Sequence, residues 1–292
     1  MKICKLLKKD AVSFSCEVFP PKENKPVDSI YASARQIAAL HPDFMSVTYG
    51  AGGSTSRHTA QLAISLQRDI GVATMAHLTC VSSTKEQIAA QLATLQAGGI
   101  ENILALRGDR PVSGDVSTDY RYAVELIADI RAMGDFCIGA ACYPEGHVEC
   151  RHKENDIDFL KAKVDAGCDF LITQMFFDNA VLYSFLYQAM KKGIHVPVIA
   201  GIMPVTGVGQ IKRSCELSGA TLPPKFKAIL DRFGDHPEAM KKAGIAYATE
   251  QIVDLIANGV RGIHLYTMNK PDVAQAILAN IAPLLACGGA PQ

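Results

Sequence analysis

The sequence lacks the cysteine pairs that mark zinc sites and disulfide frameworks. Its nine cysteines are scattered and odd in number, and none forms a Cys-x-x-Cys motif. This pattern favours reduced thiols and a cytoplasmic location. The chain also lacks a charge excess, because 29 basic side chains balance 29 acidic ones. We therefore expect neither nucleic acid nor a strongly charged membrane as a partner.

Long hydrophobic runs are also missing. No run is long enough to span a bilayer, so we expect no membrane association. The first ten residues carry four lysines and Asp10, where a secretory signal needs an apolar core. These features agree with a cytoplasmic protein.

The motifs of several enzyme classes are absent. There is no Walker phosphate loop, and no Gly-x-Gly-x-x-Gly turn follows the first predicted strand. No lysine lies inside an apolar strand as a Schiff-base nucleophile would. Histidine and acidic residues are not spaced as metal ligands, so we expect no metal.

What the sequence does contain is a repeated unit of strand, loop, amphipathic helix and glycine. Eight strands that alternate with helices predict a closed (β/α)₈ TIM barrel, with residues 1–292 as a single domain, and an open doubly wound sheet is the alternative. About sixty residues separate the last two strands, and they predict extra helices at 209–217, 225–233 and 237–258. The strands are expected to begin near Ser13, Phe44, Ala73, Asn102, Phe136, Asp169, Val196 and Gly262.

Local signals mark the helix ends. Ser83 and Glu86 have the spacing of a capping box, and Asn155 and Asp178 are candidate N-caps. Glycine follows six helices and is typical of a left-handed cap. These glycines are Gly71, Gly99, Gly134, Gly167, Gly193 and Gly259.

Chemistry in such barrels lies at the carboxyl ends of the strands. Glu17 lies in the apolar first strand, where burial disfavours the charged form and suits a carboxyl group to donate a proton. A buried structural ion pair is the alternative. The fourth strand ends in Arg107, Gly108 and Asp109, which are a cation, a residue without a side chain and an anion in succession. Gly108 would let another molecule approach the backbone closely. A surface ion pair at a turn is the alternative.

Other strand ends suit a flat ligand. The second strand runs into three glycines within residues 50–53, which allow close approach. Gln174 ends the sixth strand and can hold the amide edge of a heterocycle. Asp156 and Lys163 share a helix face, which is more often simply solvated. His77 alone is more often a core residue than a catalyst. Together these features indicate a cofactor-dependent barrel enzyme without identifying the cofactor.

Nine segments, in order along the chain, resemble methylenetetrahydrofolate reductases. They are FSCEVFPP (14–21), SVTYGA (46–51), HLTC (77–80), ALRGD (105–109), YPEGH (143–147), KVDAG (163–167), ITQ (172–174), GIMP (201–204) and HLYTMN (264–269). The resemblance implies the FAD-dependent reduction of 5,10-methylenetetrahydrofolate to 5-methyltetrahydrofolate in one-carbon metabolism. FAD would be bound non-covalently and NADH or NADPH would supply the electrons. It also implies a homo-oligomer of the bacterial type, with the catalytic domain only.

The resemblance also implies roles for single residues. Glu17 matches the general acid, and Asp109 matches the acid that stabilises the iminium form of the folate. Substrate contacts would come from Thr48, Gln174, Gln210 and Lys270. Flavin contacts would come from Tyr49, Ala51, His77, Arg107, Gly108, Asp109, Tyr122, Ala123, Tyr143, His147, Asp156 and Lys163.

Two positions depart from the family pattern. Ser214 replaces an aromatic residue that packs over the substrate, and Lys270 replaces an arginine and its bidentate fork. A flavin- and folate-binding subunit that takes electrons from a partner flavoprotein or ferredoxin is therefore an alternative. Two others are another flavin barrel, such as proline dehydrogenase, and a metal-dependent hydrolase. The hydrolase would use His77, His147 and His264.

Overall fold

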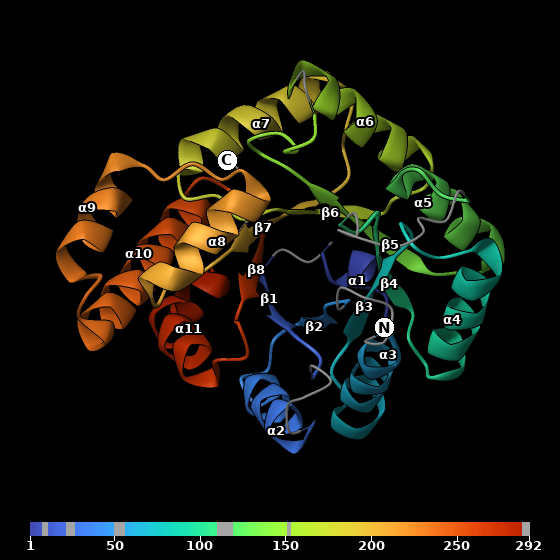
Figure 1. The fold of residues 1–292 in the computed structure, drawn as a ribbon, viewed down its shortest axis with the longest axis horizontal. Coiled ribbons are helices and arrows are strands. Elements are labelled where there is room, and N and C mark those ends of the chain that lie inside the picture. Colours follow the sequence, from blue (N-terminus) through green and yellow to red (C-terminus); the bar gives the residue numbers. More distant parts are fainter. Residues whose placement is uncertain (8–10, 22–26, 50–55, 110–118, 151–152, 288–292) are drawn as a thin grey trace.

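A closed barrel of eight parallel strands forms the centre of the molecule (Figure 1). The computed structural model describes residues 1–7, 11–21, 27–49, 56–109, 119–150 and 153–287. Each strand pairs with its neighbours in chain order, and β8 closes the ring on β1. This confirms the predicted TIM barrel and excludes the open sheet. The strands are β1 (Ser13–Val18), β2 (Phe44–Val47), β3 (Thr74–Thr79), β4 (Asn102–Leu106), β5 (Cys137–Cys142), β6 (Phe170–Thr173), β7 (Val198–Ile202) and β8 (Gly262–Tyr266).

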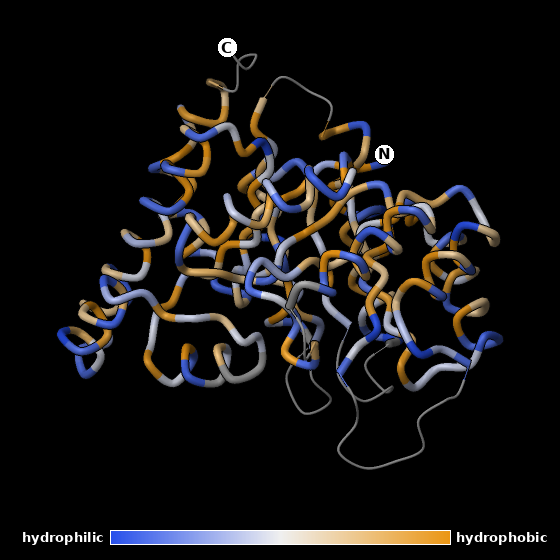
Figure 2. Tube along the Cα trace, turned by 90° about the horizontal axis from the view of Figure 1, so that it is seen from above, coloured by the Kyte–Doolittle hydropathy of each residue, from blue (hydrophilic) through white to orange (hydrophobic). Residues whose placement is uncertain are grey.

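Helices surround the barrel on its outside (Figure 1). Figure 2 shows hydrophobic and hydrophilic residues alternating along them, as expected for helices with one buried face. Within the described residues, no helix is long and apolar enough to cross a membrane. The outer helices are α2 (Val27–Ala38), α3 (Ser56–Ser65) with its π-helical end η1 (Leu66–Ile70), α4 (Lys85–Ala97), α5 (Ala123–Met133), α6 (Lys153–Asp165), α7 (Asn179–Lys191) and α11 (Pro271–Leu285).

The extra helices lie between β7 and β8, as the sequence predicts. They are α8 (Val208–Ser218), α9 (Pro224–Phe233) and α10 (Pro237–Ala257). A separate apolar cluster holds them together, in which Phe226 stacks on Phe177 at 5.3 Å between ring centroids. These helices widen the molecule beside the last two strands.

The core has two parts, separated by the barrel wall. Alternate strand residues such as Cys16 and Val18 point outward and pack beneath the helices. Inside the barrel, Phe44 and Phe170 pack with Ile3 and Leu6 of the short helix α1 (Ile3–Leu6). Figure 1 shows α1 within the ring of strands. The amino-terminal end of the barrel is therefore filled, and the polar residues of its interior lie nearer the carboxyl ends of the strands.

Three local expectations differ from the structure. Thr84, and not Ser83, caps α4: its hydroxyl accepts the Gln87 N–H at 3.3 Å, and the Gln87 side chain accepts the Thr84 N–H at 2.9 Å. This pairing satisfies two N–H groups that the helix leaves free. Asn155 lies inside α6, which begins at Lys153. Gly134 is extended at φ 177°, so it is not a left-handed cap. The predicted N-cap Asp178 is confirmed by its bond to the Ala180 N–H.

Candidate active site

Glu17 lies near the carboxyl end of β1 and points into the barrel. It alternates with the outward-facing Cys16 and Val18, and it is 7% exposed. Its Oε2 atom is 3.5 Å from His77 Nε2 and 3.8 Å from His264 Nε2. Among the described residues, no lysine or arginine forms an ion pair with Glu17. The alternative interpretation, a buried structural ion pair, would need such a cation beside Glu17, and the described residues provide none.

The two histidines beside Glu17 differ in their hydrogen bonding. Burial lowers the pKa of His77 to about 4, partly opposed by the nearby Glu17, so its ring is neutral at pH 7. His77 Nε2 is buried without a hydrogen-bond partner. His264 is bonded at both ring nitrogens, to Ser15 Oγ at 2.7 Å and to Ser46 Oγ at 3.0 Å. The His264 ring is therefore fixed, while His77 keeps an unused polar atom next to the acid.

A cavity of about 430 Å³ lies beside the ends of β4 and β5, against α5 and α6. Seven of the twelve predicted flavin residues line it: Arg107, Tyr122, Ala123, Tyr143, His147, Asp156 and Lys163. They come from two strand ends and two helices that are separate in the sequence. The fold thus brings most of the predicted cofactor set to one place, which we call the Arg107 cavity.

Charged groups of both signs line the Arg107 cavity, and its cations Arg107 and Lys163 already have partners within the protein. Glu149 accepts two hydrogen bonds from the Arg107 guanidinium, at 2.7 and 2.6 Å, and raises the pKa of Arg107. Lys163 donates to the Ala141 carbonyl at 2.8 Å, and burial lowers its pKa. Burial, and then the Arg107 charge, lower the pKa of His147. Sequence reasoning missed Glu149, although it follows the YPEGH segment by two residues.

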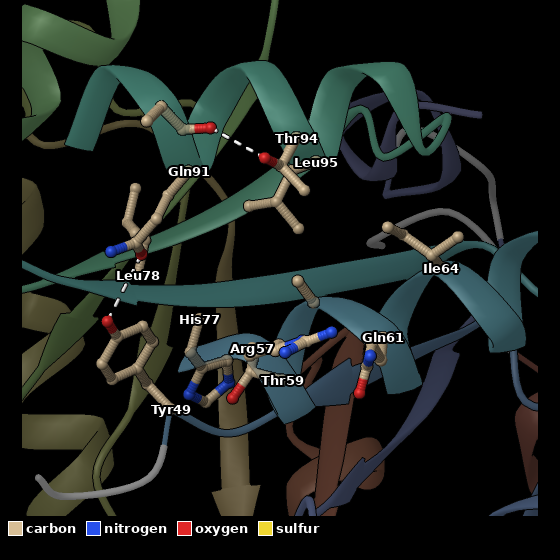
Figure 3. A pocket seen from close by; sticks show the side chains of 12 residues that line it. Tyr49, Arg57, Thr59, Gln61, Ile64, His77, Leu78, Gln91, Thr94 and Leu95 are labelled. Atoms are coloured by element: carbon tan, nitrogen blue, oxygen red, sulfur yellow. Dashed lines mark hydrogen bonds between the residues drawn. The ribbon is translucent and has the colours of Figure 1, made fainter. Parts of the chain in front are cut away.

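The remaining predicted flavin residues lie elsewhere. Tyr49 and His77 line a second cavity of about 360 Å³, which Arg57 of α3 and Gln91 of α4 also line (Figure 3). Tyr49 donates a hydrogen bond to Gln91 Oε1 at 3.3 Å there. The structure thus does not bring Tyr49 to the Arg107 cavity, and the polar Nε2 of His77 faces Glu17. Ala51 lies outside the described residues.

The turn after β4 contains a left-handed glycine. Gly108 has φ 88°, and a Cβ there would lie 3.0 Å from the Thr79 side chain. A larger residue would therefore be strained and crowded at this turn. Asp109 follows it and is exposed. Its carboxylate is thus free to face a ligand at the barrel mouth.

Thr206 connects two of the predicted substrate residues, Lys270 and Gln210. Lys270 donates to Thr206 Oγ1 at 2.6 Å, and the Thr206 hydroxyl donates to Gln210 Oε1 at 3.5 Å. Gln210 Nε2 is buried and has no partner. Sequence reasoning missed Thr206, although its position just past β7 at the active end of the barrel was a usable signal.

The other predicted substrate residues lie at strand ends. Thr48 is buried just past β2, and its carbonyl accepts the Thr59 hydroxyl at 2.9 Å. Gln174 follows β6, and its side-chain oxygen accepts the Met175 N–H at 2.9 Å, which leaves its amide nitrogen as a donor. Ser214 lies in α8.

Comparison with known proteins supplies the identification. A family model described as "Methylenetetrahydrofolate reductase" matches residues 2–282. The chain belongs to the methylenetetrahydrofolate reductase family. A maize relative, "Methylenetetrahydrofolate reductase (NADH) 1", is 37% identical over 284 residues, which cover 92% of this chain and 48% of that protein. The chain thus spans about half the length of its plant relatives in this family.

A bacterial relative is matched over most of its length. The Escherichia coli "5,10-methylenetetrahydrofolate reductase" is 32% identical over 266 residues, which cover 91% of this chain and 89% of that protein. Among solved structures, a Clostridium thermocellum protein that binds two copies of 5-methyl-5,6,7,8-tetrahydrofolic acid has a TM-score of 0.66. It is 15% identical and covers 97% of this chain, and all of that chain is matched, so it supports the fold alone.

The geometry also bears on the hydrolase alternative. Within the described residues, no group of three histidine, cysteine or acidic side chains is arranged to hold a metal ion. His147 lines the Arg107 cavity, whereas His77 and His264 face Glu17. The three histidines of that alternative are therefore divided between two places. Membership of the reductase family favours folate chemistry over the hydrolase and proline dehydrogenase alternatives.

Proposed function

We propose that this chain reduces 5,10-methylenetetrahydrofolate to 5-methyltetrahydrofolate, using non-covalently bound FAD and electrons from NADH or NADPH. The observation that carries the proposal is the Arg107 cavity, where seven residues chosen as flavin contacts meet in one site. Its volume of about 430 Å³ is in the range of natural ligand sites. Glu17 supplies a buried acid at the same end of the barrel.

The residues of the cavity fit the chemistry of FAD. Arg107 and Lys163 can balance the charge of a diphosphate, and Arg107 can bind it with two parallel hydrogen bonds once its guanidinium releases Glu149. Gly108 allows the left-handed turn after β4, where a side chain would crowd Thr79. When bound, FAD supplies the hydride-transfer chemistry, and the protein supplies binding, orientation and charge.

Glu17 is the proposed proton donor to the folate. Protonation of a folate nitrogen opens its five-membered ring to an iminium cation, which is the hydride acceptor. A positioned acid of this kind contributes about 10²–10⁴-fold in rate. Exposed Asp109 stabilises the cation by its negative charge. Thr48, Gln174, Gln210 and Lys270 hold the folate around these groups.

The test is an absorbance spectrum of the purified protein, followed by anaerobic NADH and then methylenetetrahydrofolate. We expect a yellow protein that NADH bleaches and the folate recolours. Glu17→Gln should still bleach with NADH but should not recolour. A yellow protein that ignores both NADH and NADPH would overturn the nicotinamide donor and favour a partner protein. A colourless protein that takes up no added FAD would overturn the flavin proposal itself.

A further inference from the structure

The turn that follows β8 has an unusual backbone. Met268 and Asn269 are consecutive, and both have left-handed φ angles, of 52° and 56°. His41, at φ 56°, is the other non-glycine residue of the described chain with this conformation. Left-handed backbone is costly for residues with a side chain and persists where the surroundings enforce it. The turn leads directly into Lys270, one of the proposed substrate residues.

Both ends of the Asn269 side-chain amide bond one residue, Phe19, just past the end of the neighbouring strand β1. Its Oδ1 accepts the Phe19 N–H at 2.8 Å, and its Nδ2 donates to the Phe19 carbonyl at 3.0 Å. The strands β1 and β8 are paired as far as Glu17 and Tyr266. The Asn269 side chain therefore continues the pairing of this strand end beyond the last backbone pair.

Thr267 makes the neighbouring connection. Its hydroxyl donates to the Glu17 carbonyl at 2.6 Å and accepts the Asn269 N–H at 3.2 Å. The Lys270 N–H in turn donates to the Thr267 carbonyl at 3.0 Å. Through Thr267, the turn thus connects the backbone of Glu17, the proposed acid, to the backbone of Lys270, a proposed folate contact.

We propose that Asn269 is a positioning residue, which fixes Glu17 and Lys270 relative to one another at the adjoining ends of β1 and β8. The inference rests on the proposed function. Asparagine suits this position because its amide both donates and accepts and because it tolerates left-handed backbone. Aspartate can only accept when ionised, so it would place a charge against the Phe19 carbonyl. Misplacement of reacting groups by about 1 Å can cost about 100-fold in rate.

The first test variant is Asn269→Gly, which keeps the left-handed backbone and removes both bonds to Phe19. In stopped-flow experiments on the flavin-loaded enzyme, we expect folate reduction to slow at least tenfold and the Kd for folate to rise. Bleaching by NADH and the affinity for FAD should match wild type, because neither uses Glu17 or Lys270. Asn269→Asp keeps the shape of the side chain and should show the same selective loss.

The matched control is His41→Gly. His41 has the same φ angle but precedes β2, at the opposite end of the barrel, so this variant should match wild type in both half-reactions. Asn269 variants that reduce folate at the wild-type rate would overturn the inference. Equal losses in folate reduction, NADH bleaching and FAD affinity would also overturn it, because they would indicate a merely structural role. Wild-type protein that binds flavin but leaves folate unreduced would overturn the proposed function and the inference with it.

Discussion

The neutral, buried His77 leads to a prediction about stability and pH. Burial lowers its pKa from 6.5 to about 4, so the folded protein resists protonation of this ring. The unfolded chain takes up the proton at a higher pH than the folded protein does. His77 therefore contributes its full stability above about pH 6.5, and this contribution is lost as the pH falls toward 4. Replacing His77 by Gln removes the titration.

The size of the effect follows from the shift. A difference of one pKa unit corresponds to about 1.4 kcal/mol, so the whole shift is worth about 3 kcal/mol. Relative to pH 7.5, linkage predicts a loss of about 1 kcal/mol at pH 5.5 and about 2–3 kcal/mol at pH 4.5 in wild type alone. Titrating groups remote from His77 are common to both proteins and cancel in the difference between them.

Urea unfolding of wild type and His77→Gln at pH 7.5, 5.5 and 4.5 measures this difference. The free energy of unfolding of wild type should fall more steeply with acid than that of the variant, by the amounts above. The same replacement at the exposed His195 is the control and should leave the pH dependence as in wild type. Parallel curves for wild type and His77→Gln would show that burial does not hold the ring neutral.

Three further variants test the proposed site. Glu17→Gln should slow folate reduction by about 10²–10⁴-fold while FAD stays bound and reducible, and an unchanged rate would refute the acid role. Asp109→Asn should slow the same step and raise the flavin midpoint potential, because a negative charge near the flavin disfavours its reduced anion; an unchanged potential in a redox titration would contradict this. Thr206→Val should raise the folate KM about tenfold by removing the partner of the Lys270 ammonium, and Thr206→Ser should restore it, as steady-state kinetics would show.

The barrel was predictable because its signals are local. Each strand is a short apolar run beside a turn, and all eight begin within two residues of the predicted positions. The α4 cap was missed by one residue for a local reason as well. Ser83 and Thr84 are adjacent, and each has an acid or amide three residues later, so the spacing does not distinguish them. The structure decides for Thr84, whose hydroxyl bonds the helix.

The site was predictable only in part, because its contacts join distant segments. The resemblance selected Arg107, but nothing in the sequence indicates that Glu149 holds its guanidinium. The position of Thr206 just past β7 was a signal, but only the fold shows that Lys270 lies against it. Tyr49 was grouped with the flavin residues, yet its hydroxyl bonds Gln91 between two outer helices. Side-chain direction at strand ends is set by packing, which the sequence pattern does not encode.

The proposed site has two parts, Glu17 and the Arg107 cavity, and different parts of the fold hold them. The chemistry of each part explains the difference. A proton donor must be fixed and shielded from water, and Glu17 is accordingly a strand residue beside buried rings. A cofactor needs a large contact surface that several elements can share, and the Arg107 cavity is lined by strand ends and helices. The Thr267–Asn269 turn lies on the proton-donor side, where its hydrogen bonds reach Glu17 and Phe19. In the proposed function, errors of position on this side would affect the rate of one chemical step, whereas changes in the cavity would affect the affinity for FAD.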